Sequence, residues 1–181
     1  MRMAALLLAL LLAGCSKPGW HMTDITDGMP RLNFHMTTNG KPVTGQDFRG
    51  KVVALYFGYT HCPDVCPATL ANLTDMAGKA HSPELRILFV TVDPDRDTDQ
   101  VLSDYAKAFS PQLVGLRGTA NELADLARRY RVAFEVKKGP PYEVMHSNAV
   151  FFFDRDGRAR LVTTDTTDTA AMAEDVKRLL K

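Results

Sequence analysis

The chain has 181 residues, of which 45% are hydrophobic and 24% are charged. This composition excludes collagen-like, low-complexity and wholly disordered proteins, and the length suits one compact domain with at most a short extra segment. The 22 basic and 21 acidic side chains nearly cancel, so no bulk charge favours nucleic acid or an anionic membrane. Three cysteines are too few for a disulfide-stapled miniprotein, which leaves them for other chemistry.

The N-terminus is typical of an export signal. Arg2 precedes an uninterrupted apolar run from Met3 to Ala13, which is much shorter than the roughly 20 helical residues that a bilayer core about 30 Å thick requires. The run ends in Leu12-Ala13-Gly14-Cys15, which resembles a bacterial lipobox, in which the cysteine is lipidated and becomes the new N-terminus. Ordinary signal cleavage, with Cys15 incidental, is the alternative.

These features predict a lipoprotein signal peptide over residues 1–14, a lipidated N-terminus at Cys15 and a tether through residue 30. Because the lipid anchors the chain to a membrane, an acidic or basic surface is not needed for that purpose. We expect an exported lipoprotein that faces the periplasm or the cell exterior.

From residue 31 to residue 181, predicted strands and helices alternate in one folded domain. Strands are expected over residues 31–36 and 41–43 around the turn Thr38-Asn39-Gly40, then over 51–58, 85–92, 113–116, 132–136, 148–154 and 159–164. Helices are expected over residues 67–80, 98–109, 119–130 and 169–180, and a loop is expected from residue 137 to 144. This order predicts an α/β fold, with a central β-sheet flanked by helices on both faces and an N-terminal β-hairpin.

The chemistry concentrates where the 51–58 strand passes into the next helix. Cys62 and Cys66 lie four residues apart there, which in a helix puts them on one face with Cα atoms about 6 Å apart. That separation lies inside the range of ~4.4–6.8 Å that a disulfide tolerates, and it also lets both sulfurs bind one metal ion. A helix N-terminus stabilises thiolates, which lowers the pKa and raises the reactivity.

The spacing of the two cysteines argues against several common sites. Haem c attachment uses Cys-x-x-Cys-His and most thiol oxidoreductases use Cys-x-x-Cys, whereas three residues intervene here. A closed zinc site needs four ligands, and a Cys₄ iron–sulfur cluster needs more cysteines than the chain has. A plain stabilising disulfide remains open, although closing so small a loop constrains the unfolded chain little.

A third metal ligand has to come from elsewhere in the sequence. His146 precedes the 148–154 strand, and in an α/β sheet the ends of strands and the starts of helices meet in one crevice. His61 is the rival because it adjoins Cys62, although neighbouring side chains point in different directions. Asp93 follows the 85–92 strand. It either orients a metal ligand without binding the metal itself, or it merely ends the strand in an Asp-Pro turn.

Four segments of the sequence together resemble the Sco/SenC family. They are Tyr59-Thr-His-Cys-Pro-Asp-Val-Cys-Pro67, Val92-Asp-Pro-Asp-Arg-Asp-Thr98, Phe109-Ser-Pro-Gln-Leu-Val-Gly-Leu116 and His146-Ser-Asn-Ala-Val150. The family comprises membrane-tethered copper proteins with a thioredoxin-like fold that help to assemble the binuclear copper centre of cytochrome c oxidase. The resemblance implies copper bound by Cys62, Cys66 and His146. The chain departs from it at Met145, where family members often have an acidic residue.

The resemblance therefore implies a copper metallochaperone that binds one Cu(I) or Cu(II) ion and delivers it to the copper-centre subunit of cytochrome c oxidase. Two thiolates favour Cu(I), imidazole accommodates either oxidation state, and three ligands leave a position open to a partner. Expected partners also include thiol reductants and other copper chaperones. The alternatives are a thiol–disulfide oxidoreductase, in which Cys62 and Cys66 form the redox pair and reduce a partner's copper-site cysteines, and a redox or copper sensor.

Overall fold

The computed structural model of the protein describes residues 19–181, so the predicted signal peptide and Cys15 lie outside the described residues. In chain order the elements are β1 (Thr23–Asp24), β2 (His35–Thr38), β3 (Lys41–Thr44), the 3₁₀ turn η1 (Gly45–Phe48), β4 (Val52–Gly58), α1 (Val65–Ala80), β5 (Leu85–Thr91), α2 (Asp99–Phe109), β6 (Leu113–Leu116), α3 (Ala120–Arg129), β7 (Phe134–Lys137), β8 (Glu143–His146), β9 (Val150–Phe153), β10 (Ala159–Thr163) and α4 (Thr169–Leu179).

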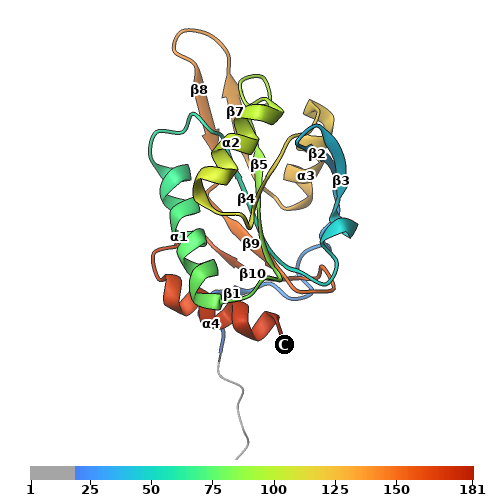
Figure 1. Ribbon diagram of the computed structural model, residues 1–181. Coiled ribbons are helices and arrows are strands. Elements are labelled where there is room, and N and C mark those ends of the chain that lie inside the picture. Colours follow the sequence, from blue (N-terminus) through green and yellow to red (C-terminus); the bar gives the residue numbers. More distant parts are fainter. Residues whose placement is uncertain (1–18) are drawn as a thin grey trace, which may run out of the picture.

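A six-stranded sheet forms the centre of the molecule, with the strand order β1-β10-β9-β4-β5-β6 (Figure 1). Strand β4 runs parallel to β5, which runs parallel to β6, whereas β4 and β9 are antiparallel. All seven residues of β4 are buried. This position explains its continuous apolar sequence, since a strand covered on both faces does not alternate with polar residues.

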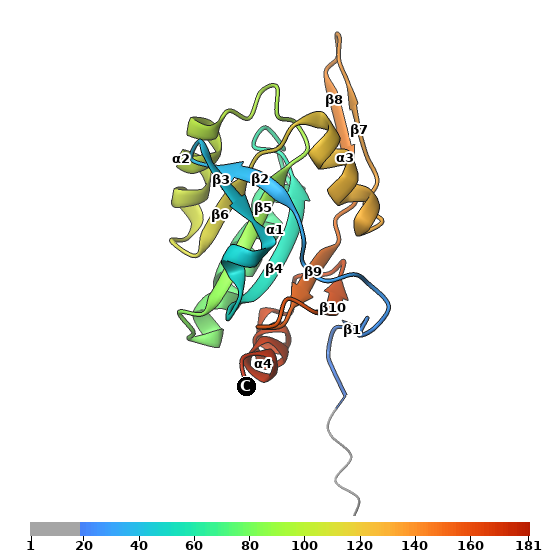
Figure 2. The same cartoon turned by 90° about the vertical axis from the view of Figure 1, so that its right-hand side faces the viewer.

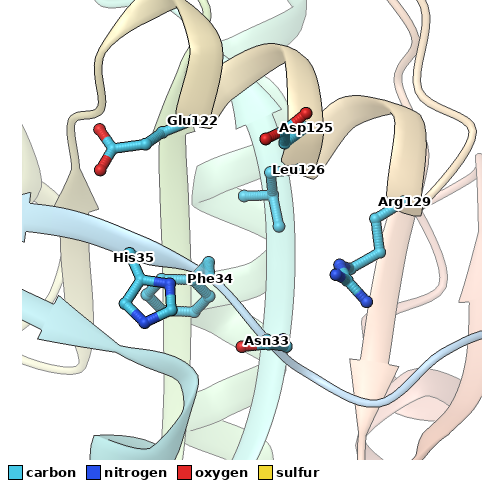
Figure 3. A pocket seen from close by; sticks show the side chains of 7 residues that line it. All are labelled: Asn33, Phe34, His35, Glu122, Asp125, Leu126 and Arg129. Carbon is cyan, nitrogen blue, oxygen red and sulfur yellow. The ribbon is translucent and has the colours of Figure 1, made fainter.

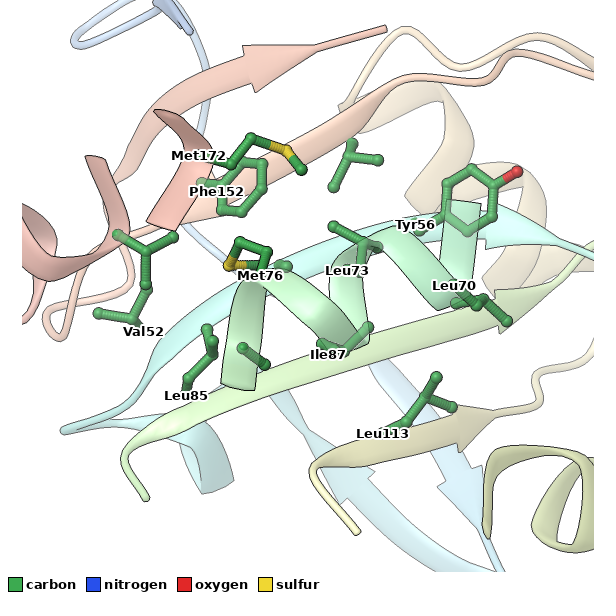
Figure 4. Packing of buried hydrophobic residues seen from close by; sticks show 14 of the residues in the cluster. Val52, Tyr56, Leu70, Leu73, Met76, Leu85, Ile87, Leu113, Phe152 and Met172 are labelled. Carbon is green, nitrogen blue, oxygen red and sulfur yellow. The ribbon is translucent and has the colours of Figure 1, made fainter. Parts of the chain in front are cut away.

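Each face of the sheet has its own hydrophobic core. On one face, Val52 and Tyr56 of β4 pack with side chains of α1 and α4, including Met76 and Met172 (Figure 4). On the other face, Leu55 belongs to a second core that includes residues of α3 and of the β2–β3 hairpin. The two cores hold β4 in place, and the candidate site begins in the loop that follows its last residue, Gly58.

The predicted α/β architecture, a thioredoxin-like central sheet flanked by helices with an N-terminal β-hairpin, is confirmed. In the hairpin, β2 and β3 pair antiparallel, and the turn residues Asn39 and Gly40 have positive φ values of 50° and 73°, as a tight hairpin turn requires. The hairpin forms a separate two-stranded sheet on the same face of the central sheet as α3 (Figure 2).

The expected loop from residue 137 to 144 is instead the turn of a second hairpin. Strand β7 begins at Phe134 and pairs antiparallel with β8, which ends at His146. These two strands form a separate sheet that projects from one end of the molecule (Figure 2). His146 therefore ends a strand of its own, and it does not lie on the central sheet.

Part of the segment predicted as a tether contacts the domain. Thr23 and Asp24 pair with β10 as its outer neighbour in the sheet, and the Met22 side chain is 7% exposed. Within residues 19–181, no helix combines the length and the apolar character that crossing a bilayer requires.

Candidate metal centre

The two cysteines lie where β4 meets α1. Cys62 belongs to the connecting loop, and Cys66 is the second residue of α1 and is fully buried. Gly58, the last residue of β4, leaves room for this arrangement, because a Cβ atom there would lie 2.6 Å from Cε2 of Phe89 and 3.0 Å from Sγ of Cys66. The glycine is thus required by the close approach of the Phe89 ring and of the Cys66 sulfur to the end of the strand.

A buried carboxylate fixes the loop just before Cys62. Asp97 is fully buried, and it accepts hydrogen bonds from the backbone N–H of Thr60 at 3.0 Å and from the Thr60 hydroxyl at 2.6 Å. It also accepts a hydrogen bond from the hydroxyl of Thr91, the last residue of β5, at 2.6 Å. Asp97 therefore ties the cysteine loop to the neighbouring central strand.

The imidazole of His146 reaches the cysteines from the base of the β7–β8 hairpin. Its Nδ1 lies 2.9 Å from the carbonyl oxygen of Ser147, an acceptor that holds the proton on Nδ1, and its Nε2 lies 3.3 Å from Sγ of Cys66. The ring meets Tyr56 and Tyr59 edge-on, with centroid distances of 6.0 and 5.9 Å. These contacts present the lone pair of Nε2 to the two sulfurs.

One ligand atom each of Cys62, Cys66 and His146 lies within 4.8 Å of the other two. Among residues 19–181, this is the one group of three or more His, Cys, Asp or Glu side chains that meets that distance. The structure thus brings together the three residues that the family resemblance implies, from a loop, a helix and a separate hairpin. Two sulfurs and one imidazole nitrogen form a donor set suited to a soft or borderline metal ion.

The two thiols differ in acidity. Partial burial acts to raise the pKa of Cys62, but hydrogen bonds to its sulfur from the Cys66 backbone N–H, at 3.3 Å, and from the Cys66 thiol and the Asp64 N–H outweigh it, so the pKa lies below its usual value. For Cys66, deeper burial dominates and raises the pKa to about 12. Cys62 is accordingly the thiol that ionises more readily.

The two other site candidates from the sequence lie outside this group. His61 turns toward Thr60 and Asp97, with its Nδ1 3.5 Å from Oδ1 of Asp97. Asp93 is 1% exposed, pairs with Arg96 and accepts a hydrogen bond from the hydroxyl of Tyr142 at 2.8 Å. The contacts of Asp93 thus reach the turn of the β7–β8 hairpin, and none of its hydrogen bonds goes to a proposed ligand.

Sequence reasoning missed the residues that connect the hairpin to the body of the protein. The guanidinium of Arg96 lies 3.9 Å from the ring centre of Tyr142 and 5.8 Å from that of Tyr59. Asp93 is a candidate from the sequence, and Arg96 belongs to the same quoted segment, Val92–Thr98, which is the signal that could have identified it. Their partner Tyr142 lies in the segment expected to be a loop, and nothing in its sequence context indicates the contact.

A mostly apolar groove opens beside the three residues. Its lining comprises the cysteine loop, the start of α1 and the end of β8, namely Tyr59, Cys62, Pro63, Asp64, Val65, Val144, Met145, His146 and Asn148. The side chains of Val65 and Met145 are 48% and 61% exposed. The site is therefore accessible from solvent across a surface that is rich in apolar side chains.

A second hollow lies elsewhere, between α3 and the segment that enters the β2–β3 hairpin (Figure 3). The labelled side chains from α3 face those of residues 33–35 across it: Asn33, Phe34, His35, Glu122, Asp125, Leu126 and Arg129. It contains one histidine and two carboxylates, but these do not form a close group of metal ligands in the described part of the chain.

Comparisons with known proteins agree with this site. The sequence model of the SCO1/SenC family matches residues 31–181. The mitochondrial SCO1 homologue of Mus musculus is 42% identical over 142 residues, which cover 72% of this chain and 49% of that protein. The chain thus spans about half the length of the curated relatives that it matches first.

Two similar solved structures are described as containing copper. The ScoI protein of Arabidopsis thaliana with copper bound has a TM-score of 0.76 and 32% identity, covering 82% of this chain and 96% of that one. The ScoI protein of Bradyrhizobium japonicum with copper bound has a TM-score of 0.74 and 33% identity, covering 82% and 98%. With a family match over most of its length and a thioredoxin-like fold shared with these structures, the chain belongs to the SCO1/SenC family.

Proposed function

We propose that this protein is a copper metallochaperone, which holds one copper ion between Cys62, Cys66 and His146 and passes it to the copper-centre subunit of cytochrome c oxidase during assembly. The observation that carries the proposal is the convergence of two thiols and one imidazole nitrogen within 4.8 Å. Copper is the cargo of this function, and the donor set fits it. Thiolates are soft ligands that favour Cu(I), and imidazole binds either oxidation state.

The arrangement favours transfer over storage. Three protein ligands leave a coordination position open, and the apolar groove at Val65 and Met145 gives a partner surface on which to dock. A thiolate or imidazole of the partner enters from that side and replaces the ligands one at a time. Because metal binding requires deprotonated thiols, a disulfide between Cys62 and Cys66 prevents loading, so thiol reductants or a copper-loaded chaperone must act first.

The two copper-bound relatives support the choice of metal, and membership of the SCO1/SenC family supports cytochrome c oxidase as the recipient. The lipobox at Cys15 and the apolar run before it support an exported, membrane-anchored lipoprotein whose domain faces the periplasm or the cell exterior. This anchor is part of the proposal, and Cys15 lies outside the described residues.

An anaerobic titration of the reduced protein with Cu(I) tests the metal site, with a His146→Ala variant beside it and His61→Ala as the matched control. We expect one copper per chain in the wild type and in His61→Ala, and at least about a tenfold weaker affinity in His146→Ala, in the range that loss of a ligand or its support causes. Equal affinity in all three proteins would exclude His146 as a ligand and with it the three-residue site. Transfer is tested by incubating loaded protein with the copper-free oxidase subunit and measuring copper in each after separation.

A thiol–disulfide reductase that keeps the partner's copper-site cysteines reduced is the second candidate function. It is favoured by the arrangement of the thiols, because Cys62 lies in the open groove and Cys66 is buried behind it with its N–H directed at the Cys62 sulfur. Cys62 attacks a partner disulfide to form a mixed disulfide, and Cys66 then displaces the partner's thiol, so that two electrons pass to the partner. Under this function His146→Ala leaves disulfide exchange nearly intact, which distinguishes it from copper delivery.

A further inference from the structure

The first described residues are fixed to the side of α4. The backbone N–H groups of His21 and Met22 donate hydrogen bonds to Oδ2 of Asp175, at 2.8 and 2.9 Å. Asp175 is fully buried, so its carboxylate depends on these donors and on Arg178, whose guanidinium lies 3.5 Å from Oδ1. Because a buried carboxylate without partners is costly, these contacts hold the segment firmly.

The same segment is also held at Gly19 and Trp20. The guanidinium of Arg178 lies 3.7 Å from the ring centre of Trp20, and it donates a hydrogen bond to the carbonyl oxygen of Gly19 at 2.8 Å. Arg178 belongs to the last turn of α4. The chain therefore joins the folded domain at the carboxyl end of this helix.

That place lies at the opposite end of the central sheet from the candidate site. Arg155 donates hydrogen bonds to the carbonyl oxygens of Gly50, just before β4, and of Leu180, just after α4, so both lie at the amino end of β4. The cysteine loop follows the carboxyl end of this seven-residue strand, roughly 20 Å away. Both ribbon views show α4 and the start of the described chain at one end, and the β7–β8 hairpin at the other (Figures 1 and 2).

Only four peptide steps separate Cys15 from Gly19, which span at most about 14 Å when fully extended. We infer that the end of the domain formed by the carboxyl terminus of α4 and the amino end of β4 faces the lipid headgroups of the bilayer. The Cys62, Cys66 and His146 group is then held on the side that points away from the membrane. This inference rests on the proposed lipidation of Cys15, and it adds an orientation that the metal site alone does not imply.

The charge at this end suits a phospholipid surface. Neither Lys51, just before β4, nor Lys177, in the last turn of α4, forms an ion pair with a carboxylate within residues 19–181. Their ammonium groups are thus available to lipid phosphates close to the anchor.

Energy transfer from two positions on the protein to a headgroup-linked acceptor tests the orientation. The full chain, processed in the cell, is reconstituted in vesicles of phosphatidylethanolamine and phosphatidylglycerol. One protein carries a dye on Cys62 in a Cys66→Ser background, and the other carries it on Lys181→Cys in a Cys62→Ser, Cys66→Ser background. We expect several-fold greater transfer from position 181 than from position 62. Inserting about ten Gly and Ser residues after Ser16, with a root-mean-square reach of roughly 17 Å, should bring the ratio toward one.

The outcomes distinguish failure of the proposed lipid anchor from failure of the proposed orientation. A mature mass without acyl chains, together with loss of the protein from the vesicles, would refute the proposed anchor and the orientation with it. Retention on the vesicles with equal transfer from both positions would overturn the orientation alone. An unchanged ratio in the variant with the insertion would show that the short connection does not set the orientation. None of these results depends on copper binding, which the titration measures separately.

Discussion

Nε2 of His146 lies 3.3 Å from the sulfur of Cys66, although 80 positions of sequence separate the two residues. The contact exists because the β7–β8 hairpin ends at His146 beside the start of α1, and because Nδ1 of the imidazole donates a hydrogen bond to the carbonyl oxygen of Ser147. The geometry of the proposed copper site thus depends on residues that do not bind the metal themselves, and substitutions test each of them separately.

The first prediction concerns the reactivity of the two thiols. Cys62 has a lowered pKa and Cys66 a pKa raised to about 12, so at neutral pH the thiolate forms mainly at Cys62. In the reduced, metal-free protein we expect iodoacetamide to modify Cys62 first, at a rate that rises with pH and levels off below the usual thiol pKa. Peptide mass spectrometry at a series of pH values measures this. Faster modification of Cys66 than of Cys62 in the wild-type protein would contradict this prediction. As a control, Cys66→Ser should leave the rate at Cys62 within a few-fold of the wild-type rate.

The second prediction concerns the glycine at the end of β4. In Gly58→Ala the new Cβ meets Phe89 and the Cys66 sulfur closer than normal contact allows, so we expect a loss of about 1–3 kcal/mol of stability and weaker copper binding. Urea unfolding and Cu(I) titration measure the two effects. Gly78→Ala is the matched control, because nothing lies within 4 Å of its Cβ inside α1, and it should gain up to about 1 kcal/mol. Equal stability of the two variants would show that the contact at Gly58 is unimportant.

The third prediction concerns Asp97. Asp97→Ala leaves the donors of the half-buried Thr60 and the buried Thr91 without their acceptor, which costs about 1–3 kcal/mol for each donor that water does not reach. We expect lower stability in urea and faster alkylation of Cys62, because the loop before it loses its fixed point. Asp104→Ala, a substitution of an exposed carboxylate within α2, should change the alkylation rate little. Wild-type rates in Asp97→Ala would refute the positioning role.

The fourth prediction concerns the link between Asp93 and Tyr142. Tyr142→Phe removes the hydrogen bond to Asp93 but keeps a ring beside Arg96, so we expect a small loss of stability, about 0.5–1.5 kcal/mol. Amide exchange should become faster in β7 and β8 and remain unchanged in β4. Unchanged exchange in the hairpin would show that the contact does not hold it. If Asp93 instead acted directly on a metal ligand, Asp93→Asn would weaken copper binding while Tyr142→Phe would not.

Much of the fold could be predicted because apolar runs and helix-capping residues are visible within short segments of the sequence. The apolar run of β4 indicates a buried strand, and Thr119 and Glu122 form the capping box that begins α3, with both reciprocal hydrogen bonds present. Asp168 likewise caps α4, accepting a hydrogen bond from the N–H of Ala171. Cys62 and Cys66 were found for the same reason, since their spacing and the end of the strand are visible in one segment.

The remaining features depend on partners distant in sequence. Strand β8 is four residues long, and it is a strand because it pairs with β7 across a turn that contains two prolines. The two residues of β1 carry no pattern, and the segment before them is fixed by Asp175, more than 150 positions away. His146 is preferred to His61 because it precedes the 148–154 strand and because the family resemblance implies it as a ligand, but the hairpin that carries it was not predicted.

The β7–β8 hairpin gives the three proposed ligands unequal mechanical support. Both cysteines lie where the central sheet meets α1, whereas His146 ends a separate two-stranded ribbon. The body holds this ribbon through the contacts of Tyr142 with Asp93 and Arg96, through an ion pair between Lys138 and Asp95, and through packing of Phe134 and Val144 against the second core. Isolated two-stranded ribbons are only marginally stable, and such elements open locally at a far lower free energy than the whole domain. Local opening of the ribbon would therefore withdraw the imidazole while both thiols stay in place, so the number of protein ligands would fall from three to two without unfolding the central sheet.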